Sequence, residues 1–354
     1  IVLREPLLQI MNTPAESYDE ALRYATICMI GLVFIYGYNI ISAILRGMGD
    51  SRRPLYYLIV SSVLNVILDL LFVGVLGFGV KGAAIATVVS QSVSALLCLW
   101  QFTRKDTVYR LEWKKLRMDR RSLREIVKFG LPTGVQNSVI GLANVLVQRN
   151  INTFQEEAMA ACGAYSRIEG FVFLPIMSFS MALTSFIGQN LGAKEYDRAR
   201  QGARFGILAS VIMAEVIGLI VFFFGGNLIG LFIKDADAEK LQRIIAIGST
   251  QCRVESLSFF IQHIQQGIFV FFFLLAFSHA IAGICRGAGK AVVPMAIMLA
   301  VWCVFRIIYI TAAMAIRHEI ILLFIAYPLT WFISSVIYFI YYKKSNWIHG
   351  FDLN

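Results

Sequence analysis

The sequence predicts an all-α polytopic membrane protein whose helices pack as one bundle, and three observations support this fold class. Of the 354 residues 58% are hydrophobic, and the mean hydropathy is +0.69, whereas soluble domains are roughly 45–50% apolar. Apolar runs of about 20 residues, the length that crosses a hydrocarbon layer, recur along the chain. Stretches such as 208–224 are apolar on all sides, which excludes the alternating strands of an outer-membrane barrel.

We expect about nine membrane-spanning helices joined by short loops. The apolar runs that predict them lie near residues 24–45, 55–77, 83–102, 129–154, 162–187, 203–233, 255–284, 292–314 and 320–342.

The net charge of +10 could indicate a nucleic-acid partner, but its placement indicates a membrane topology instead. Residues 104–128 hold ten Lys and Arg against four acids. The other basic clusters lie near 46–53, 194–204, 286–290 and 343–344. All fall on alternate inter-helix loops, while the opposite loops carry acids or little charge. By the positive-inside rule the basic loops are cytoplasmic. We therefore expect a multi-pass protein of the plasma (inner) membrane and no nucleic-acid partner.

A short motif occurs twice. The residues RGMGDSRRP at 46–54 return as RGAGKAVVP at 286–294, an offset of 240 positions (286 − 46). Each copy leaves one long helix and enters another, which predicts glycines in a tight turn, an arginine at a helix C-terminus and a proline in the first turn of the next helix. The shared context favours an internal duplication; two similar but unrelated turns are the alternative.

The duplication predicts two pseudo-symmetric six-helix lobes, of which the first is incomplete. The second motif copy is preceded by three apolar helices between 129 and 233, whereas the first copy is preceded by only some twenty residues of helix. If the two lobes are equivalent, we expect roughly a hundred further residues, with about three helices, before Ile1. The expected division is an incomplete N-lobe with its last three helices, a basic cytoplasmic linker, and a six-helix C-lobe. Their bounds are 1–102, 103–128 and 129–354. About ten extra residues near 259–271 form an irregular insertion, or a sequence error, in the second copy.

Two polar side chains stand four residues apart in an apolar run. Asn65 and Asp69 in LNVILDLLF point from one face of the expected helix. A carboxylate at that depth either binds a cation through oxygen ligands or stays protonated, and a coupling site exchanges those two states. Asn39 on the preceding helix and Thr87 on the following one can supply further oxygens. The alternative is an aspartate hydrogen-bonded structurally to neighbouring helices.

A polar stripe marks the helix expected at 129–154. Asn137, Asn144 and Gln148 recur at helical spacing, with Gln136 beside them. The stripe predicts either the wall of a substrate cavity or interhelical hydrogen bonds of about 0.6 kcal/mol each. Arg306 is expected to pair with an acid, for which Glu255 is a candidate. We expect no metal centre beyond a possible Na⁺ at Asp69, since no CxxC pair or HExxH motif occurs.

These motifs together resemble the multidrug and toxic compound extrusion (MATE) transporters over nearly the whole chain. The resemblance rests on the two motif copies, on LNVILDLLF with GVKGAAIATVVSQ, on FGLPTGVQNS, and on FLPIMSFSMALTSFIGQNLGAKEYDRAR. It implies a sodium or proton site in the first lobe, whose family positions become Asn39, Asn65, Asp69 and Thr87. The family's first-helix aspartate has no counterpart here. Another branch places acids in the second lobe, where this chain has Ile140 and about Leu275, so the first-lobe site is favoured.

The resemblance implies transport and no enzymatic activity. The expected protein is a secondary active antiporter that exports amphipathic or cationic drugs and toxic organic compounds in exchange for Na⁺ or H⁺ by alternating access. It would act as a monomer on small drug-like molecules, with the coupling ion and no cofactor. Two alternatives stay open. A lipid-linked precursor flippase needs several cations in its cavity, for which only Arg149 and Arg306 are candidates. The other alternative is a non-transporting membrane scaffold or receptor.

Overall fold

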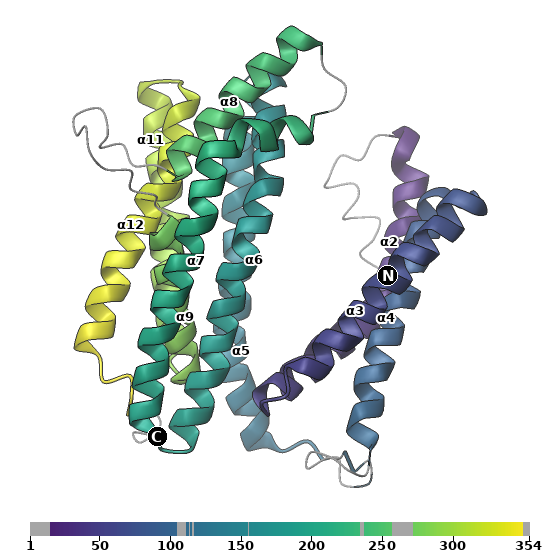
Figure 1. Cartoon of the computed structure of the whole chain (residues 1–354), viewed down its shortest axis with the longest axis vertical. Coiled ribbons are helices and arrows are strands. Elements are labelled where there is room, and N and C mark those ends of the chain that lie inside the picture. Colours follow the sequence, from purple (N-terminus) through teal and green to yellow (C-terminus); the bar gives the residue numbers. More distant parts are fainter. Residues whose placement is uncertain are drawn as a thin grey trace. The chain divides into compact units, whose positions relative to one another are not determined.

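The structure, a computed structural model, describes residues 15–104, 111–112, 114, 117–154, 156–233, 237–256 and 272–349. Every regular element in these ranges is a helix, and the chain divides into two units between Arg117 and Met118, each described by itself (Figure 1). The first unit holds α2 (Ala15–Gly47), α3 (Arg52–Asp69), the π-helical segment η1 (Leu70–Val75) and α4 (Gly79–Thr103). The second holds α5 (Arg120–Ile151), α6 (Glu156–Gly192), α7 (Tyr196–Leu231), α8 (Ala238–Ser256), α9 (Phe272–Gly287), α10 (Val292–Met298), the π-helical segment η4 (Leu299–Phe305), α11 (Arg306–Ile316) and α12 (Ile320–Lys344).

Seven spans among the described residues are long and apolar enough to cross a membrane. They are Tyr18–Gly47, Arg52–Val75, Gly79–Thr103, Glu156–Gly192, Tyr196–Leu231, Val292–Ile316 and Ile320–Lys344. These confirm seven of the nine predicted runs. Of the other two runs, 129–154 lies in α5, whose polar stripe lowers its mean hydropathy, and the described part of 255–284 holds the shorter apolar helix α9. The protein is therefore an all-α, multi-pass membrane protein.

Three boundaries differ from those expected. Helix α5 begins at Arg120, inside the predicted linker 103–128, because the side chain of Asp119 accepts the backbone N–H of Ser122 and caps the helix. Helix α8 was not predicted, because its polar residues interrupt any apolar run long enough to indicate a membrane-spanning helix. Of the predicted span 255–284 the structure describes residues 255–256, at the end of α8, and residues 272–284, in α9. The expected insertion at 259–271 lies outside the described residues.

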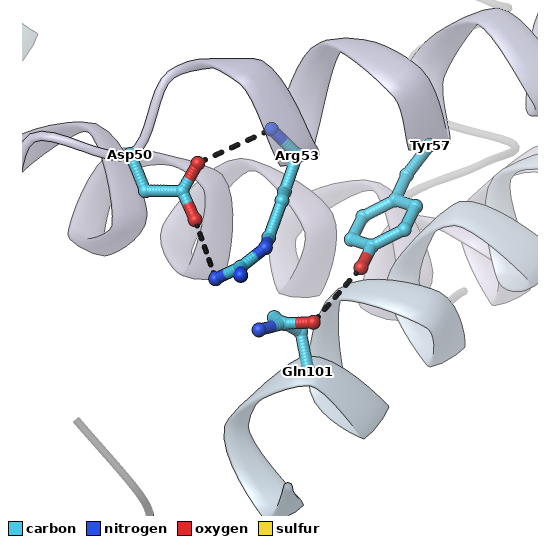
Figure 2. A network of polar contacts seen from close by, with 4 residues as sticks. All are labelled: Asp50, Arg53, Tyr57 and Gln101. Carbon is cyan, nitrogen blue, oxygen red and sulfur yellow. Dashed lines mark hydrogen bonds and ion pairs between the residues drawn. The ribbon is translucent and has the colours of Figure 1, made fainter. Parts of the chain in front are cut away.

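In the first unit, α4 packs against both α2 and α3, while α2 and α3 touch each other little. A polar contact ties two of these helices near the first motif (Figure 2): the hydroxyl of Tyr57 on α3 donates to Oε1 of Gln101 on α4 at 3.1 Å. Beside it Arg53 pairs with Asp50 at 3.0 Å. Helix α4, which carries Thr87, therefore holds the unit together.

In the second unit, α9 is the central helix and nearly all of its side chains are buried. It packs against α6, α7 and α12, and α6 and α7 run side by side in Figure 1. Two hydrogen bonds tie α6 to the backbone of α9. Ser180 donates to the carbonyl of His279 at 2.6 Å. Thr184 donates to the carbonyl of Gly283 at 3.0 Å. Small side chains at this crossing let the two backbones approach closely.

The two motif copies form the same turn. In the first copy Gly49 has φ 88° and donates to the carbonyl of Arg46 at 3.0 Å. In the second copy Gly289 has φ 76° and donates to the carbonyl of Arg286 at 3.0 Å. The next amide in each copy reaches one residue further back, which completes a Schellman motif. Both arginines lie in the last turn of their helices, and Pro54 and Pro294 lie in the first turn of α3 and α10, as predicted. Gly47 and Gly287 are the last residues of α2 and α9, so only the second glycine of each copy forms the turn.

The proline that follows each turn is held in the same way, but by a different helix. Tyr38 on α2 donates its hydroxyl to the carbonyl of Pro54 at 3.1 Å. In the second unit Tyr338 on α12 donates to the carbonyl of Pro294 at 3.3 Å. The two units thus use tyrosines from different helices to stabilise equivalent prolines.

Burial follows the same offset of 240 positions along α4 and α12. Six pairs of equivalent residues are buried in both units: Ala84 and Phe324, Ala86 and Ala326, Ser90 and Thr330, Ser94 and Ser334, Ala95 and Ser335, Cys98 and Tyr338. A shared burial pattern, a shared turn and a shared proline contact do not arise from two unrelated turns. The structure therefore supports the predicted duplication and fixes its register.

We expect Gly289→Ala to destabilise the second unit by about 1 kcal/mol, because an L side chain in the left-handed region costs about 1–2 kcal/mol. The measurement is thermal unfolding of the purified protein in detergent. Gly226→Ala is the control, since its added Cβ would meet Cγ2 of Ile245 at an ordinary 3.5 Å. Equal unfolding temperatures for the two variants would contradict a strained turn at Gly289.

Candidate functional site

The predicted pair lies where α3 changes its helical form. Asp69 is the last residue of α3, and the π-helical segment η1 begins at Leu70. Asn65 stands four residues before Asp69, and both side chains are half-buried. Single π-helical turns inside α-helices often mark functional sites. The sequence pattern gave no signal for this change of helix, which places a widened turn directly after the carboxylate.

Both members of the pair carry a buried polar atom without a hydrogen-bond partner. These atoms are Nδ2 of Asn65 and Oδ1 of Asp69. An unsatisfied buried polar group costs about 1–3 kcal/mol, and more when it is charged. A half-turn of the Asn65 amide exchanges its NH₂ group for its carbonyl oxygen. The pair can then present two oxygens to a cation, or Asp69 can take up a proton.

Asn39 and Thr87 make their hydrogen bonds within their own helices. The amide of Asn39, which is exposed, donates to the carbonyl of Ile35 at 2.8 Å. The hydroxyl of Thr87 donates to the carbonyl of Ala83 at 2.9 Å. Among the described residues no hydrogen bond joins either side chain to Asp69. Their side-chain oxygens remain available as acceptors, so their role as further ligands stays a prediction.

Sequence reasoning missed one neighbour of the carboxylate. Tyr24 on α2 interacts electrostatically with Asp69, although the two residues are far apart in the chain and no spacing rule connects them.

The polar stripe of α5 divides into two sets. Asn137, Asn144 and Gln148 are exposed, as a wall that faces a cavity would be. Gln136 is not part of this wall: it is 4% exposed and donates from Nε2 to the sulfur of Met298 at 2.6 Å. One residue along a helix turns a side chain by about 100°, which carries Gln136 onto the face packed against α10.

The charged residues inside the second unit have partners that the sequence did not identify. Glu215 on α7 accepts the backbone N–H of Phe273 at 3.0 Å and so caps the start of α9. Glu169 on α6 interacts electrostatically with Arg306, and the pairing of Arg306 with Glu255 stays a prediction. The side chain of Glu255, the candidate from the sequence, lies outside the described residues.

The basic clusters of the second unit gather at one end. Lys290, in the turn after α9, donates to the carbonyl of Asn346, beyond α12, at 3.3 Å. The rings of Tyr196, at the start of α7, and His349 lie 4.8 Å apart. The opposite end of α6 begins with acids, and there Glu156 pairs with Lys240 at 3.0 Å. The clusters near 194–204, 286–290 and 343–344 therefore share one end of this unit, as the loop pattern predicts.

Comparison with known proteins supports the same fold. The protein-family model described as MatE matches residues 1–71 and 132–312. The chain is 28% identical over 349 residues to the probable multidrug resistance protein YoeA of Bacillus subtilis, covering 95% of this chain and 70% of that protein. It is 31% identical over 236 residues to the probable multidrug resistance protein YpnP of the same organism, covering 67% of this chain and 53% of that protein.

A crystal structure of MATE in the bent conformation superposes with a TM-score of 0.83 at 21% identity, over 96% of this chain and 72% of that one. At this identity the likeness shows the fold alone. The family model, in contrast, covers well over half of the chain, and the matched residues include both Asn65 and Asp69. The chain therefore belongs to the MatE family of multidrug and toxic compound extrusion (MATE) proteins.

Proposed function

We propose that this chain carries out ion-coupled export of small amphipathic or cationic organic compounds as a secondary active antiporter. The observation that carries the proposal is the pair Asn65 and Asp69, which leaves a buried amide nitrogen and a buried carboxylate oxygen unpartnered at the start of a π-helical turn. A charged carboxylate with no bound cation or proton has a high free energy in an apolar helix. Uptake of a cation or proton relieves that cost, and movement of the ion down its electrochemical gradient supplies the free energy that drives the cycle.

In this mechanism Asp69 takes up Na⁺ or H⁺, with Asn65, Asn39 and Thr87 as the neighbours that offer further oxygens. The widened turn of η1 gives the helix a place to change its hydrogen bonding when the charge is neutralised. The exposed residues Asn137, Asn144 and Gln148 are proposed to line the substrate cavity. No cofactor is required beyond the coupling ion, and the family membership favours transport over an enzymatic reaction.

The proposed setting is the plasma (inner) membrane, with a single chain as the working unit. The basic end of the second unit, which holds Lys194, Arg198, Lys290 and Lys343, is proposed to face the cytoplasm, as the positive-inside rule requires. The names of the relatives YoeA and YpnP are consistent with multidrug export. Since the chain spans 70% and 53% of their lengths, the activity of the whole protein is part of the proposal.

The test is efflux of a cationic dye from vesicles that contain the full-length protein. We expect dye movement against its gradient when an inward Na⁺ gradient or an inward proton gradient is imposed, and none with both gradients collapsed. Imposing one gradient at a time identifies the coupling ion. Dye movement that persists with both collapsed, or that requires ATP, would contradict ion-driven antiport.

A further inference from the structure

Arg306 is a cation enclosed by protein in the middle of the second unit. It is 2% exposed, and its guanidinium lies over the rings of Trp302 and Tyr327, at 5.2 Å and 4.6 Å from their centroids. Its Nη2 donates to the hydroxyl of Thr330 at 2.8 Å. Glu169 on α6 interacts with it electrostatically. The guanidinium is thus held by two π faces and a hydroxyl, with an acidic side chain acting on it from α6.

The duplication relates Arg306 to the candidate ion site of the first unit. Ser61 and Val301 are equivalent at the 240-residue offset and are buried in both units. In α3, Asn65 stands one α-helical turn beyond Ser61. In η4 the turn is wider, because the amide of Arg306 donates to the carbonyl of Val301, five residues back. The side chain one turn beyond Val301 is thus Arg306, which takes the place that Asn65 has in the first unit.

Two more members of the candidate ion site map onto this surround. Thr87 corresponds to Tyr327, which underlies the guanidinium. Asn39 corresponds to His279, a buried residue whose ring meets Trp302 edge-on at 5.5 Å. No acid corresponds to Asp69, since the offset of 240 leads to Tyr309 and the register shifted at η4 leads to Ile310. The second unit therefore lacks the carboxylate of the first and holds a fixed positive charge at the equivalent place.

We propose that Arg306 is a built-in counterpart of the coupling cation, so that the second unit holds permanently the charge that the first unit binds and releases. The comparison of the two units rests on the proposed function of Asp69, whereas the role of Arg306 inside its own unit does not. Each transport cycle then couples to the ion bound in the first unit alone. Glu169 acts as the anionic partner that the tethered cation neutralises.

The experiment uses chemical rescue of the natural protein, with unfolding temperature in detergent as the readout. Arg306→Met removes the charge, keeps much of the volume, and leaves Glu169 without its cation. We expect a lower unfolding temperature, and recovery of most of the loss when low millimolar methylguanidinium replaces tetramethylammonium at equal ionic strength. The matched control is Arg200→Met on α7, where the arginine is exposed and paired with Asp197; it should show neither effect. Identical unfolding temperatures of Arg306→Met in the two salts would overturn the proposal.

A second variant covers the case in which Arg306→Met does not fold. Glu169→Gln/Arg306→Met removes both charges, and we expect it to be more stable than Arg306→Met alone because no buried carboxylate is left unneutralised. A double variant no more stable than the single one would overturn the charge pairing.

The same measurement separates this proposal from the proposed antiport. In Asp69→Asn, we expect that Na⁺ and pH no longer shift the unfolding temperature in the range where the unaltered protein responds. Methylguanidinium should still raise the unfolding temperature of the double variant Asp69→Asn/Arg306→Met. An ion response that survives in Asp69→Asn and disappears with Glu169→Gln would place an exchangeable ion in the second unit and overturn the inference. Absence of any ion response in the unaltered protein would count against the antiport alone.

Discussion

Replacing Asp69 by Asn is expected to abolish ion-driven efflux and to leave the fold intact. The substitution removes the titratable charge while nearly preserving shape, and a neutral amide at this depth is less costly to desolvate than a carboxylate. Drug binding in detergent should persist within about tenfold, or 1.4 kcal/mol, because the amphipathic ligand is expected to contact the cavity wall more than this acid. The measurements are dye efflux under an imposed gradient and ligand binding to the purified protein.

The matched control for this substitution is Asp197→Asn on α7, whose carboxylate is exposed and pairs with Arg200 at 3.5 Å. Surface ion pairs contribute about 0–1 kcal/mol, so efflux should be unchanged there. Normal ion-driven efflux by Asp69→Asn would remove the carboxylate from the mechanism and return it to a structural role. Loss of both efflux and binding would mean that Asp69 also shapes the cavity.

Substituting Gly283 by Val is expected to prevent the second unit from folding normally. A Cβ at this position would lie 2.4 Å from the carbonyl oxygen of Ser180 and 2.9 Å from its hydroxyl. The closest atom is backbone, so it cannot move aside as a flexible side chain would. The hydrogen bonds that Ser180 and Thr184 make to the backbone of α9 would be broken as the helices separate. Overpacking typically costs about 1–3 kcal/mol, and here we expect roughly 3 kcal/mol or more.

The unfolding temperature and the monodispersity of the detergent-purified variant measure this effect. Gly163→Val on α6 is the control, because nothing lies within 4 Å of its added Cβ. The control should therefore change stability only by the small helix-propensity difference, which favours valine over glycine. If Gly283→Val unfolds at the same temperature as Gly163→Val, the close approach of α6 and α9 is not what stabilises this unit.

The fold class followed from the sequence because the lipid environment leaves few choices. Backbone polar groups in hydrocarbon must be satisfied within the segment, so long apolar runs without alternation dictate helices. The repeated RGxGxxxxP motif predicted its own structure for a similar reason: the left-handed turn at Gly49 and Gly289 is open to few residues besides glycine. Asn65 and Asp69 stood out because polar groups are rare in such runs, and their four-residue spacing already placed them on one face.

Other features needed the tertiary structure, because they depend on contacts between segments far apart in the chain. Helix α8 has no apolar run to reveal it. Gln136 differs from the exposed stripe by a rotation about α5, and only the position of Met298 shows that it is buried. The electrostatic interaction of Arg306 with Glu169 joins two segments far apart in the chain, so no local pattern could indicate it.

The π-helical turns are the clearest case of this division. Their residues, LLFVGV and LAVWCVF, are ordinary apolar helix formers, and no local pattern separates an i→i+5 turn from an i→i+4 turn. The sequence by itself therefore determined the apolar helices, the repeat and the two polar residues Asn65 and Asp69 of the first unit. Packing determined where the helices widen, and the one-residue shift in η4 is what brings Arg306, in place of Phe305, to the position equivalent to Asn65.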